Sequence, residues 1–291
     1  MQKIMKRIAA FMLAAMMVAS MSACNRQSEE EPGSSASSGA SSSASSTKSS
    51  SKGKDDYKPT VPDVADKMKA AKEKNADVVG WLQIPNTTID EAVVQTTDND
   101  FYLRKDVEKN YAYEGCYYVD YESELKNNGK DLPQNTIIYG HNLGTPMGVK
   151  DDPEGVKFAQ LLKFNEEKFA KENPYIYFTT EGAQHIFEIF AVAYCEPTTS
   201  PVPYHMASYD GDKFLRLVDD MMDRSLWTYE VPFSEDDKII TLSTCTYKYG
   251  TYNQNPNQRF VVFGKLVKDG ESFHKEANLK PNAKIKEPNF G

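Results

Sequence analysis

The spacing of apolar residues changes along the chain, and each spacing predicts a different element. After Pro62, the residues Val64, Met68 and Ala71 recur at helical spacing, which predicts an N-terminal helix through Lys74. A second helix is expected over residues 155–170. A third and longer helix is expected over residues 210–226, where one face collects the apolar side chains Phe214, Leu217, Val218, Met221 and Met222.

Short runs rich in β-branched and aromatic residues lie between these helices, and Gly, Pro, Asn and Asp separate them. Such runs predict β-strands, here at residues 78–84, 92–95, 115–119, 136–139, 175–179, 185–194, 238–244 and 259–267. Many strands joined by turns, with helices inserted among them, favour a mainly β fold. The pattern predicts a β-barrel with peripheral helices.

The first 24 residues carry the pattern of an export signal. Lys3, Lys6 and Arg7 precede an apolar run at 8–19, and small residues stand before Cys24. The pattern resembles a bacterial lipoprotein signal, in which the cysteine becomes the lipid-modified N-terminus. An uncleaved signal anchor and plain secretion are the alternatives. All three place the rest of the chain outside the cytoplasm.

A serine-rich tether is expected at residues 25–56, because 12 of the 18 residues from 34 to 51 are serine. Such a stretch buries too little apolar surface to offset its ordering entropy. A folded domain is expected over residues 57–268, followed by a polar tail at 269–291. The tail lacks a Pro-x-Thr-Gly motif, an apolar span and a basic end, which argues against a cell-wall-anchored substrate. The predicted arrangement is a domain tethered to the membrane at the cell surface.

Charge and cysteine content exclude two classes of protein. The chain has 34 Lys and Arg residues against 42 Asp and Glu residues, a formal net charge of −8. Because no cationic cluster lies beyond the first few residues, a nucleic-acid partner is not expected. Four cysteines in 291 residues are too few for a disulfide scaffold.

The cysteines differ in their surroundings. Cys116 and Cys195 lie in apolar segments and are interpreted as core residues, and a disulfide between them stays open. Cys245 ends the apolar run 239–244 and precedes a polar loop. A side chain at a strand end is held rigidly and still meets solvent, which suits a nucleophile.

A cysteine nucleophile needs a partner that takes its proton, and imidazole is the usual one. Of the four histidines, His141 directly follows the run 135–140 and so also stands at a strand end. His185 begins a strand, His205 lies in a proline-rich loop and His274 in the polar tail. The spacing favours a pair of His141 with Cys245 without deciding it.

Two motifs then carry a family resemblance: Tyr139-Gly140-His141-Asn142, and Thr241-Leu242-Ser243-Thr244-Cys245 with Arg259 opening the next strand. They resemble the active-site motifs of sortases, the cysteine transpeptidases of Gram-positive surfaces. The chain resembles class B sortases more narrowly, over about residues 64–267, through Gly80-Trp81-Leu82, Ile84-Pro85, Val93-Val94-Gln95, Asn99, Tyr102-Leu103, Asp120-Tyr121 and the helix at 210–226.

The resemblance implies a closed barrel with an N-terminal helix and an additional long helix between late strands. It also implies acyl transfer: Cys245 attacks a peptide carbonyl and His141 serves as acid and base. Arg259 would hold the oxyanion or the substrate backbone. The residues expected to line the groove are Asn99, Leu103, Tyr139 and Ser243, and for each a packing role is the alternative.

The implied partners are surface proteins with a C-terminal sorting motif of the Leu/Asn-Pro-x-Thr type and an amine acceptor from peptidoglycan or pilin. No metal or other cofactor is required, and the Asp pairs at 55–56, 151–152 and 236–237 are interpreted as solvated loop charges. Of the other arginines, Arg104, Arg216 and Arg224 are expected at exposed positions.

Several departures from the class B pattern leave the substrate motif open. Thr246 stands where many members carry an acidic residue, residues 148–155 resemble an insertion, and a lipoprotein-like signal replaces the usual anchor. A surface cysteine peptidase and a non-catalytic peptide-binding lipoprotein are the alternative functions.

Overall fold

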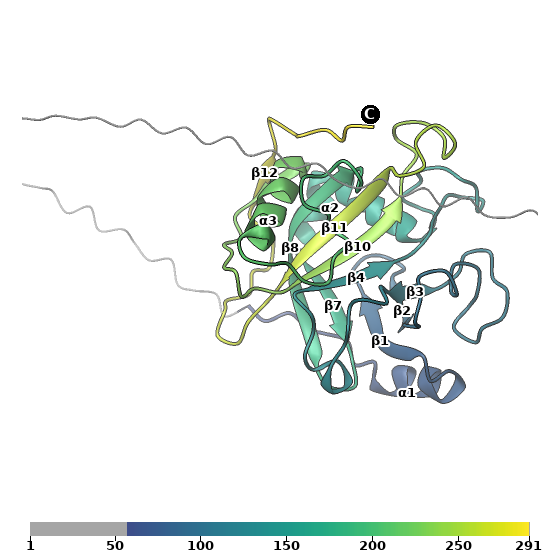
Figure 1. Ribbon diagram of the computed structural model, residues 1–291. Coiled ribbons are helices and arrows are strands. Elements are labelled where there is room, and N and C mark those ends of the chain that lie inside the picture. The colour runs from purple at the N-terminus through teal and green to yellow at the C-terminus, as the bar shows by residue number, and fades with distance from the viewer. Residues whose placement is uncertain (1–56, 291) are drawn as a thin grey trace, which may run out of the picture. The chain divides into compact units, whose positions relative to one another are not determined.

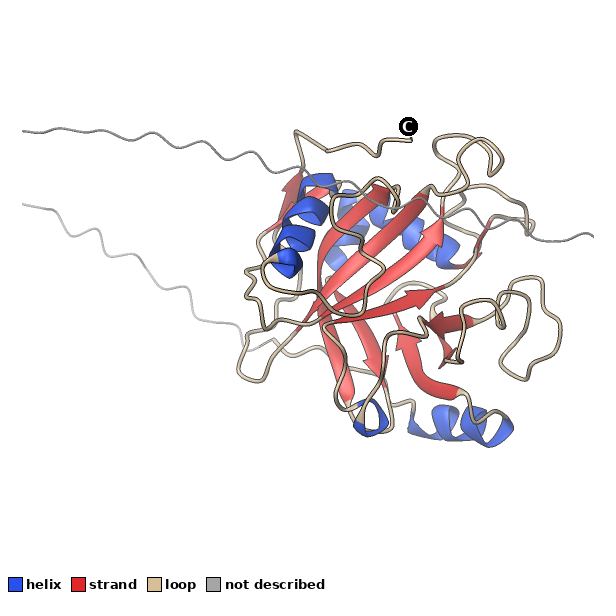
Figure 2. Ribbon diagram, viewed as in Figure 1, coloured by secondary structure: helices blue, strands red, loops and turns tan. Residues whose placement is uncertain are grey.

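Eight strands close into a β-barrel, as Figures 1 and 2 show. The computed structural model describes residues 57–290, so the predicted signal with Cys24 and the tether at 25–56 lie outside the described residues. The barrel strands are β1 (Val78–Gln83), β2 (Asp90–Val94), β3 (Tyr117–Val119), β4 (Asn135–Tyr139), β7 (Tyr175–Thr179), β8 (Gln184–Cys195), β10 (Ile239–Cys245) and β11 (Arg259–Leu266). Their order is β1-β2-β3-β4-β10-β11-β8-β7, and β7 pairs with β1 to close the ring. The predicted mainly β barrel is confirmed.

The remaining elements lie around this barrel. The helices are α1 (Ala65–Lys74), α2 (Glu167–Glu172) and α3 (Lys213–Arg224), with 3-10 helices η1 (Asn127–Gly129) and η2 (Phe158–Asn165). Two short strand pairs complete the set: β5 (Asn142–Leu143) with β6 (Val156–Lys157), and β9 (Trp227–Tyr229) with β12 (Leu279–Pro281).

One parallel pairing fixes which strand ends meet. β4 runs parallel to β10, in register from Asn135 opposite Ile239 to Tyr139 opposite Ser243. Parallel strands end at the same edge of a sheet. The loops that follow both strands therefore leave the barrel at one rim.

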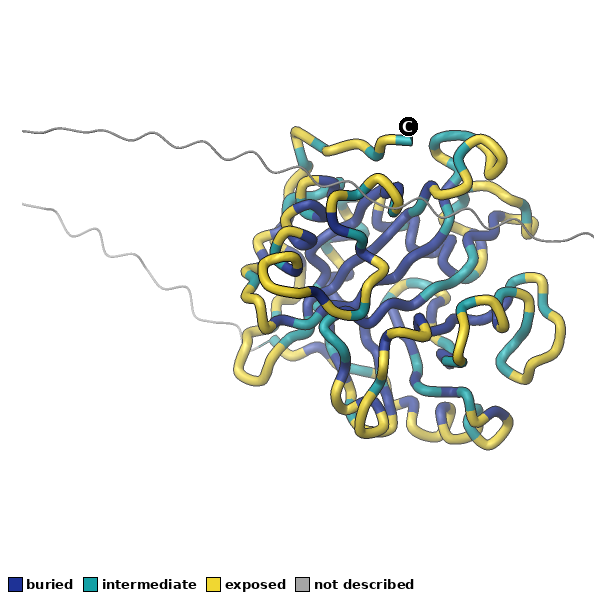
Figure 3. Tube along the Cα trace, in the orientation of Figure 1, coloured by how far each residue is buried: buried dark blue, intermediate teal, exposed yellow. Residues whose placement is uncertain are grey.

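The second half of β8 is covered on both sides, which explains its continuous apolar sequence from Ile189 to Cys195. Its residues from Ile189 to Cys195 are all buried. Phe214, Leu217, Val218 and Met221 of α3 are buried in the same apolar cluster, and Figure 3 shows the barrel strands beside the helix largely in dark blue. The apolar face predicted for residues 210–226 is confirmed, except that Met222 is only partly buried.

The N-terminal helix packs on a second, smaller apolar cluster. Met68 of α1 is buried there with Val78, Val94 and Tyr102. α1 begins at Ala65, three residues after the predicted start at Pro62. This cluster also holds Cys116, so that cysteine is a core residue as expected.

The helix predicted over residues 155–170 is wrong in its first part. Gly155 approaches its neighbour so closely that a Cβ atom there would lie 2.1 Å from the Leu143 carbonyl oxygen. Lys157 adopts a left-handed conformation with φ of 57°. Because β6 pairs with β5 at this point, the chain becomes helical only at Phe158, and an extended Glu166 then separates η2 from α2.

The polar segment 269–290 is packed against the domain. Ala277 and Leu279 are buried, and β12 pairs with β9. Further along, Glu287 accepts a hydrogen bond from the Tyr249 hydroxyl, and the Phe290 ring lies 5.0 Å from the Tyr249 ring. Since Tyr249 belongs to the loop between β10 and β11, Glu287 and Phe290 contact that loop and help to hold it in place.

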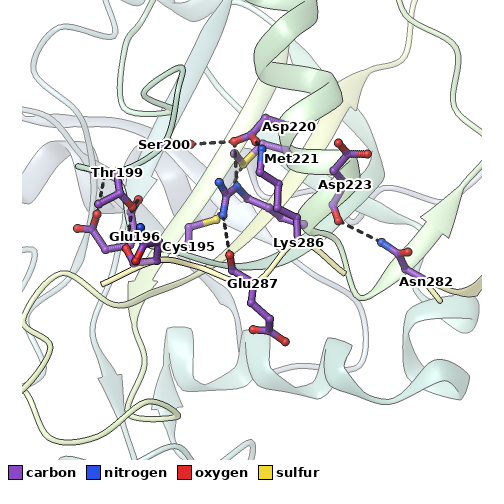
Figure 4. A network of polar contacts seen from close by, with 12 residues as sticks. Cys195, Glu196, Thr199, Ser200, Asp220, Met221, Asp223, Asn282, Lys286 and Glu287 are labelled. Atoms are coloured by element: carbon purple, nitrogen blue, oxygen red, sulfur yellow. Dashed lines mark hydrogen bonds and ion pairs between the residues drawn. The ribbon is translucent and has the colours of Figure 1, made fainter. Parts of the chain in front are cut away.

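Arg224 was expected at the surface and is buried instead. It donates from Nε to Asp220 over 2.9 Å, and both side chains are only 6% exposed. Lys286 and Ser200 donate to the same carboxylate (Figure 4). Burial alone would raise the pKa of Asp220, but the hydrogen bonds from Arg224, Lys286 and Ser200 outweigh it and lower that pKa. The network ties α3 to the C-terminal segment.

Two arginine–aspartate pairs on α3 provide a matched test of this network. Arg224→Ala leaves the buried Asp220 with Lys286 as its remaining cation, so we expect a loss of about 2–3 kcal/mol in the free energy of unfolding. Arg216→Ala removes the same i,i+4 contact at the helix surface, where Arg216 is 58% and Asp212 70% exposed, and should cost less than about 0.5 kcal/mol. Urea unfolding of both variants measures the difference, and equal losses would contradict a buried role for Arg224.

Candidate active site

The three residues expected to carry the chemistry meet at one rim of the barrel. Cys245 is the last residue of β10, and it pairs with Arg259, the first residue of β11. His141 follows β4 after Gly140. The parallel pairing of β4 with β10 brings His141 to the rim where Cys245 and Arg259 stand.

A cavity of about 290 Å³ opens between these strand ends. All seven predicted site residues line it: Asn99, Leu103, Tyr139, His141, Ser243, Cys245 and Arg259. The other lining residues, which sequence reasoning did not single out for the site, are Asp100, Tyr118, Gly140 and Thr244. The structure therefore gathers the predicted set around one cavity that contains a thiol, an imidazole and a guanidinium.

Hydrogen bonds lock the His141 and Cys245 strand ends together. The Thr244 hydroxyl donates to the Gly140 carbonyl oxygen over 2.7 Å. The Asn142 side chain donates from Nδ2 to the Cys245 carbonyl oxygen over 2.9 Å. Each bond joins one strand end to the other, so the backbone segments that carry His141 and Cys245 are held together.

The surroundings of His141 set its tautomer and its charge. Nε2 lies 2.7 Å from the Leu103 carbonyl oxygen. Because a carbonyl oxygen only accepts, Nε2 carries hydrogen and Nδ1 is the basic nitrogen of the neutral ring. Burial lowers the pKa of His141 below its usual 6.5, and the charges of Arg104 and Lys157 lower it further against the opposing effect of Leu103. The imidazole is therefore mainly neutral at pH 7.

The three described cysteines are free thiols, and only one of them reaches the cavity. Burial raises the pKa of Cys116 and of Cys195 to about 12, so both stay protonated at neutral pH. Cys195 contacts the Met221 sulfur at 3.9 Å, whereas Cys116 lies in the apolar cluster under α1. Cys245 alone is partly exposed. The disulfide that the sequence left open does not form in this structure.

Arg259 closes the loop that leads away from Cys245. Its Nη1 donates to the carbonyl oxygens of Pro256 over 2.8 Å and Gln258 over 2.9 Å. Within residues 57–290, Nε and Nη2 have no hydrogen-bond partner. The guanidinium is thus anchored at one nitrogen and retains donors for a further acceptor.

Two side chains that sequence reasoning did not place at the site orient its walls. Asp120, only 4% exposed, accepts hydrogen bonds from the Asn99 amide and the Tyr139 hydroxyl, each over 2.9 Å. The Tyr204 hydroxyl lies 3.0 Å from the Ser243 hydroxyl. In the sequence, Asp120 was noted only as part of the segment Asp120-Tyr121 that resembles class B sortases. The contact of Tyr204 could not be predicted from local pattern, because its partner Ser243 is 39 residues away.

Residues 57–290 contain no cluster of three or more His, Cys, Asp or Glu side chains arranged for a metal ion. None of the helices in this range has the length and apolar character needed to span a bilayer. The Asp pair at 151–152 was expected to be solvated, but Asp151 is half-buried and bonded to Asn142, Thr246 and Tyr247.

Comparison with known proteins agrees with this geometry. The family model for the sortase domain matches residues 82–267. The chain belongs to the sortase family. It is 33% identical to sortase B of Listeria monocytogenes over 70% of this chain and 76% of the relative, and 27% identical to sortase B of Staphylococcus aureus over the same shares.

Solved structures of class B sortases share the fold. Sortase B of Clostridium perfringens superposes with a TM-score of 0.57 at 29% identity, over 69% of this chain and 99% of that one. A Staphylococcus aureus sortase B–substrate complex gives a TM-score of 0.58 at 25% identity, over 70% and 86%. The chain is a class B sortase, a cysteine transpeptidase that acts on surface proteins, and the peptidase and binding-protein alternatives are not favoured.

The protonation state of His141 can be measured directly. We expect its pKa in an NMR titration to lie below 6.5. Arg104→Gln removes a positive charge that disfavours the imidazolium, so the pKa should rise toward 6.5, with more imidazolium at neutral pH. Arg216→Gln on α3, which takes no part in the cavity, should leave the pKa unchanged. A wild-type pKa above 6.5 would show that the ring is not held neutral by its surroundings.

Proposed function

We propose that Cys245, His141 and Arg259 carry out the transpeptidation. The Cys245 thiol gives its proton to the neutral His141 imidazole as the sulfur attacks the carbonyl carbon of a sorting motif, and the imidazolium passes that proton to the leaving amine as the peptide C–N bond breaks. An incoming amine then attacks the thioester carbonyl. It gives a proton to His141 and forms the new amide bond as the C–S bond breaks, and the proton passes from His141 to the Cys245 sulfur to restore the thiol.

The observation that carries this proposal is the register of three strands at one rim. Cys245 lies opposite Arg259 across the β10–β11 pair, and the parallel β4 ends beside them with His141. A nucleophile, an acid–base group and a cationic donor therefore surround one cavity. Acyl transfer needs these three roles in this proximity.

The substrate and acceptor are inferred from two relatives. A Staphylococcus aureus sortase B has been solved with its substrate, and a sortase B has been solved with triglycine. We infer that this chain takes a C-terminal sorting motif of the Leu/Asn-Pro-x-Thr type and an amine acceptor from peptidoglycan or pilin. Asn99, Leu103, Tyr139 and Ser243 would line the groove for the motif, since all four face the cavity.

The place of action follows from the N-terminal pattern. We propose that the domain works outside the cytoplasm, held at the cell surface by its N-terminus, of a Gram-positive bacterium. A lipid on Cys24 and an uncleaved signal anchor are both compatible with the apolar run at 8–19. The serine-rich tether at 25–56 would give the domain reach from the membrane.

The nucleophile is tested by one substitution and a peptide library. Incubating the domain with candidate sorting peptides and an amine acceptor, followed by mass spectrometry, should reveal both the thioester and the transfer product. Cys245→Ala is expected to abolish both without loss of folding, because the side chain is partly exposed and its removal leaves little buried cavity. Cys195→Ala, which alters a buried thiol, should keep the activity. Full activity in Cys245→Ala would remove this residue from the mechanism.

Arg259 is tested by a charge-preserving change. In Arg259→Lys the ammonium cannot hold the loop carbonyls and a developing oxyanion together, as the planar guanidinium can. We expect kcat to fall by about 100- to 1000-fold, as for loss of one oxyanion donor, with a smaller change in KM. Steady-state kinetics on the best library peptide measures this. A kcat within about threefold of wild type would make Arg259 a structural residue.

A further inference from the structure

Asp151 connects the segments that follow the two reactive residues. Its Oδ1 accepts hydrogen bonds from the Asn142 side chain over 2.7 Å and from the Tyr247 backbone amide over 3.1 Å. Its Oδ2 accepts from the Thr246 hydroxyl over 2.6 Å. Asn142 comes directly after His141, and Thr246 and Tyr247 come directly after Cys245.

The link continues to the backbone of the nucleophile. The Asn142 amide that donates to Asp151 also donates to the Cys245 carbonyl oxygen over 2.9 Å. One carboxylate therefore receives three donors from two loops, and one of these donors holds Cys245 itself. Displacing Asp151 would remove the contacts that join Thr246 and Tyr247 to the segment after His141.

Asp151 forms no salt bridge with a residue of the described range 57–290. Its hydrogen bonds come from an amide, a hydroxyl and a backbone N–H, all neutral donors. Half-buried and bonded on both oxygens, it is held as an acceptor rather than as half of an ion pair. A carboxylate that receives several neutral donors fixes their directions more strongly than a neutral acceptor does.

The neighbouring Asp152 gives a contrast within the same loop. It accepts hydrogen bonds from the backbone amides of Thr145 and Glu154, and it pairs with Lys150. All of its partners lie within residues 144–155. Asp152 thus shapes the loop itself, whereas Asp151 joins the loop to the residues after Cys245.

We propose that Asp151 is a positioning residue for transpeptidation, which fixes Cys245 relative to His141 by bridging the segments that follow them. The proposal rests on the proposed function of those two residues. A displacement of about 1 Å at a reacting group costs on the order of 100-fold in rate, so the bridge should affect turnover more than substrate binding.

The test compares Asp151→Ala with Asp151→Asn, and both with the control Asp152→Ala. Asparagine can still accept through Oδ1 from Asn142 and Tyr247 and can donate to the Thr246 hydroxyl, so it should keep the bridge. We expect kcat of Asp151→Ala to fall by about 10- to 100-fold with KM within about threefold. Asp151→Asn should retain at least about a third of the wild-type kcat, and Asp152→Ala should resemble wild type.

A second measurement needs no substrate. Hydrogen exchange of the Tyr247 amide, followed by mass spectrometry or NMR, should be faster in Asp151→Ala because its acceptor is gone. It should stay slow in Asp151→Asn and Asp152→Ala. If the wild-type domain transfers no acyl group to any amine, the proposed function fails, and the exchange rates still show whether Asp151 holds the residues after Cys245.

Several results would overturn the proposal. These are a kcat of Asp151→Ala within threefold of wild type, an equal loss in Asp152→Ala, a loss confined to KM, or unchanged exchange at Tyr247. An Asp151→Asn variant as inactive as Asp151→Ala would show that charge, not the bridge, is needed. Should Asp151→Ala not fold, Thr246→Val removes one donor from the other side, and unchanged kcat and exchange there would also refute the bridge.

Discussion

The parallel pairing of β4 with β10 is the constraint on which the site depends. The other neighbours of these two strands, β3 and β11, run antiparallel to them. Because β4 and β10 point the same way, the residues that follow them emerge at one rim, and the antiparallel β11 begins at that rim. His141, Cys245 and Arg259 are brought together although 118 residues separate the first from the last. Backbone hydrogen bonds, not contacts between the reactive side chains, set this arrangement.

Three buried or half-buried carboxylates then hold segments outside the barrel strands in place. Asp120 orients two wall residues of the cavity, Asp151 links the segments after His141 and Cys245, and Asp220 joins α3 to the C-terminal segment. Of these three carboxylates, Asp220 is the one paired with cations, Arg224 and Lys286. Asp120 and Asp151 accept hydrogen bonds from neutral donors instead. These bonds hold the neighbouring side chains in fixed directions around the site of the Cys245 thiol.

Local sequence patterns predicted most of the barrel and favoured the pair of His141 with Cys245, because strand runs and strand-end residues are short-range signals. Asn99, Leu103, Tyr139 and Ser243 were expected at the site only through the resemblance to class B sortases. The burial of Arg224 was not predicted, although its helical spacing already indicated a buried position. Leu217, Met221 and Arg224 follow one another at spacings of four and three, which places Arg224 on the buried stripe of α3. The default of an exposed arginine overrode the periodicity, and Asp220 four residues earlier supplied the partner that makes burial tolerable.

Other features could not be predicted because their cause is distant in sequence. The segment 269–291 is polar, and its packing depends on β9 and on Tyr249, which are brought near only by the completed barrel. Adjacent aspartates 151 and 152 look alike in sequence, yet one is bonded to Thr246, 95 residues away, and the other only to its own loop. The sequence predicts a solvated loop charge at both positions, so the difference between their hydrogen-bond partners arises only from the tertiary structure. In this fold the positions of His141 and Cys245 at strand ends can be recognised from the sequence. The role of Asp151 can be recognised only from the residues that it contacts in the folded structure.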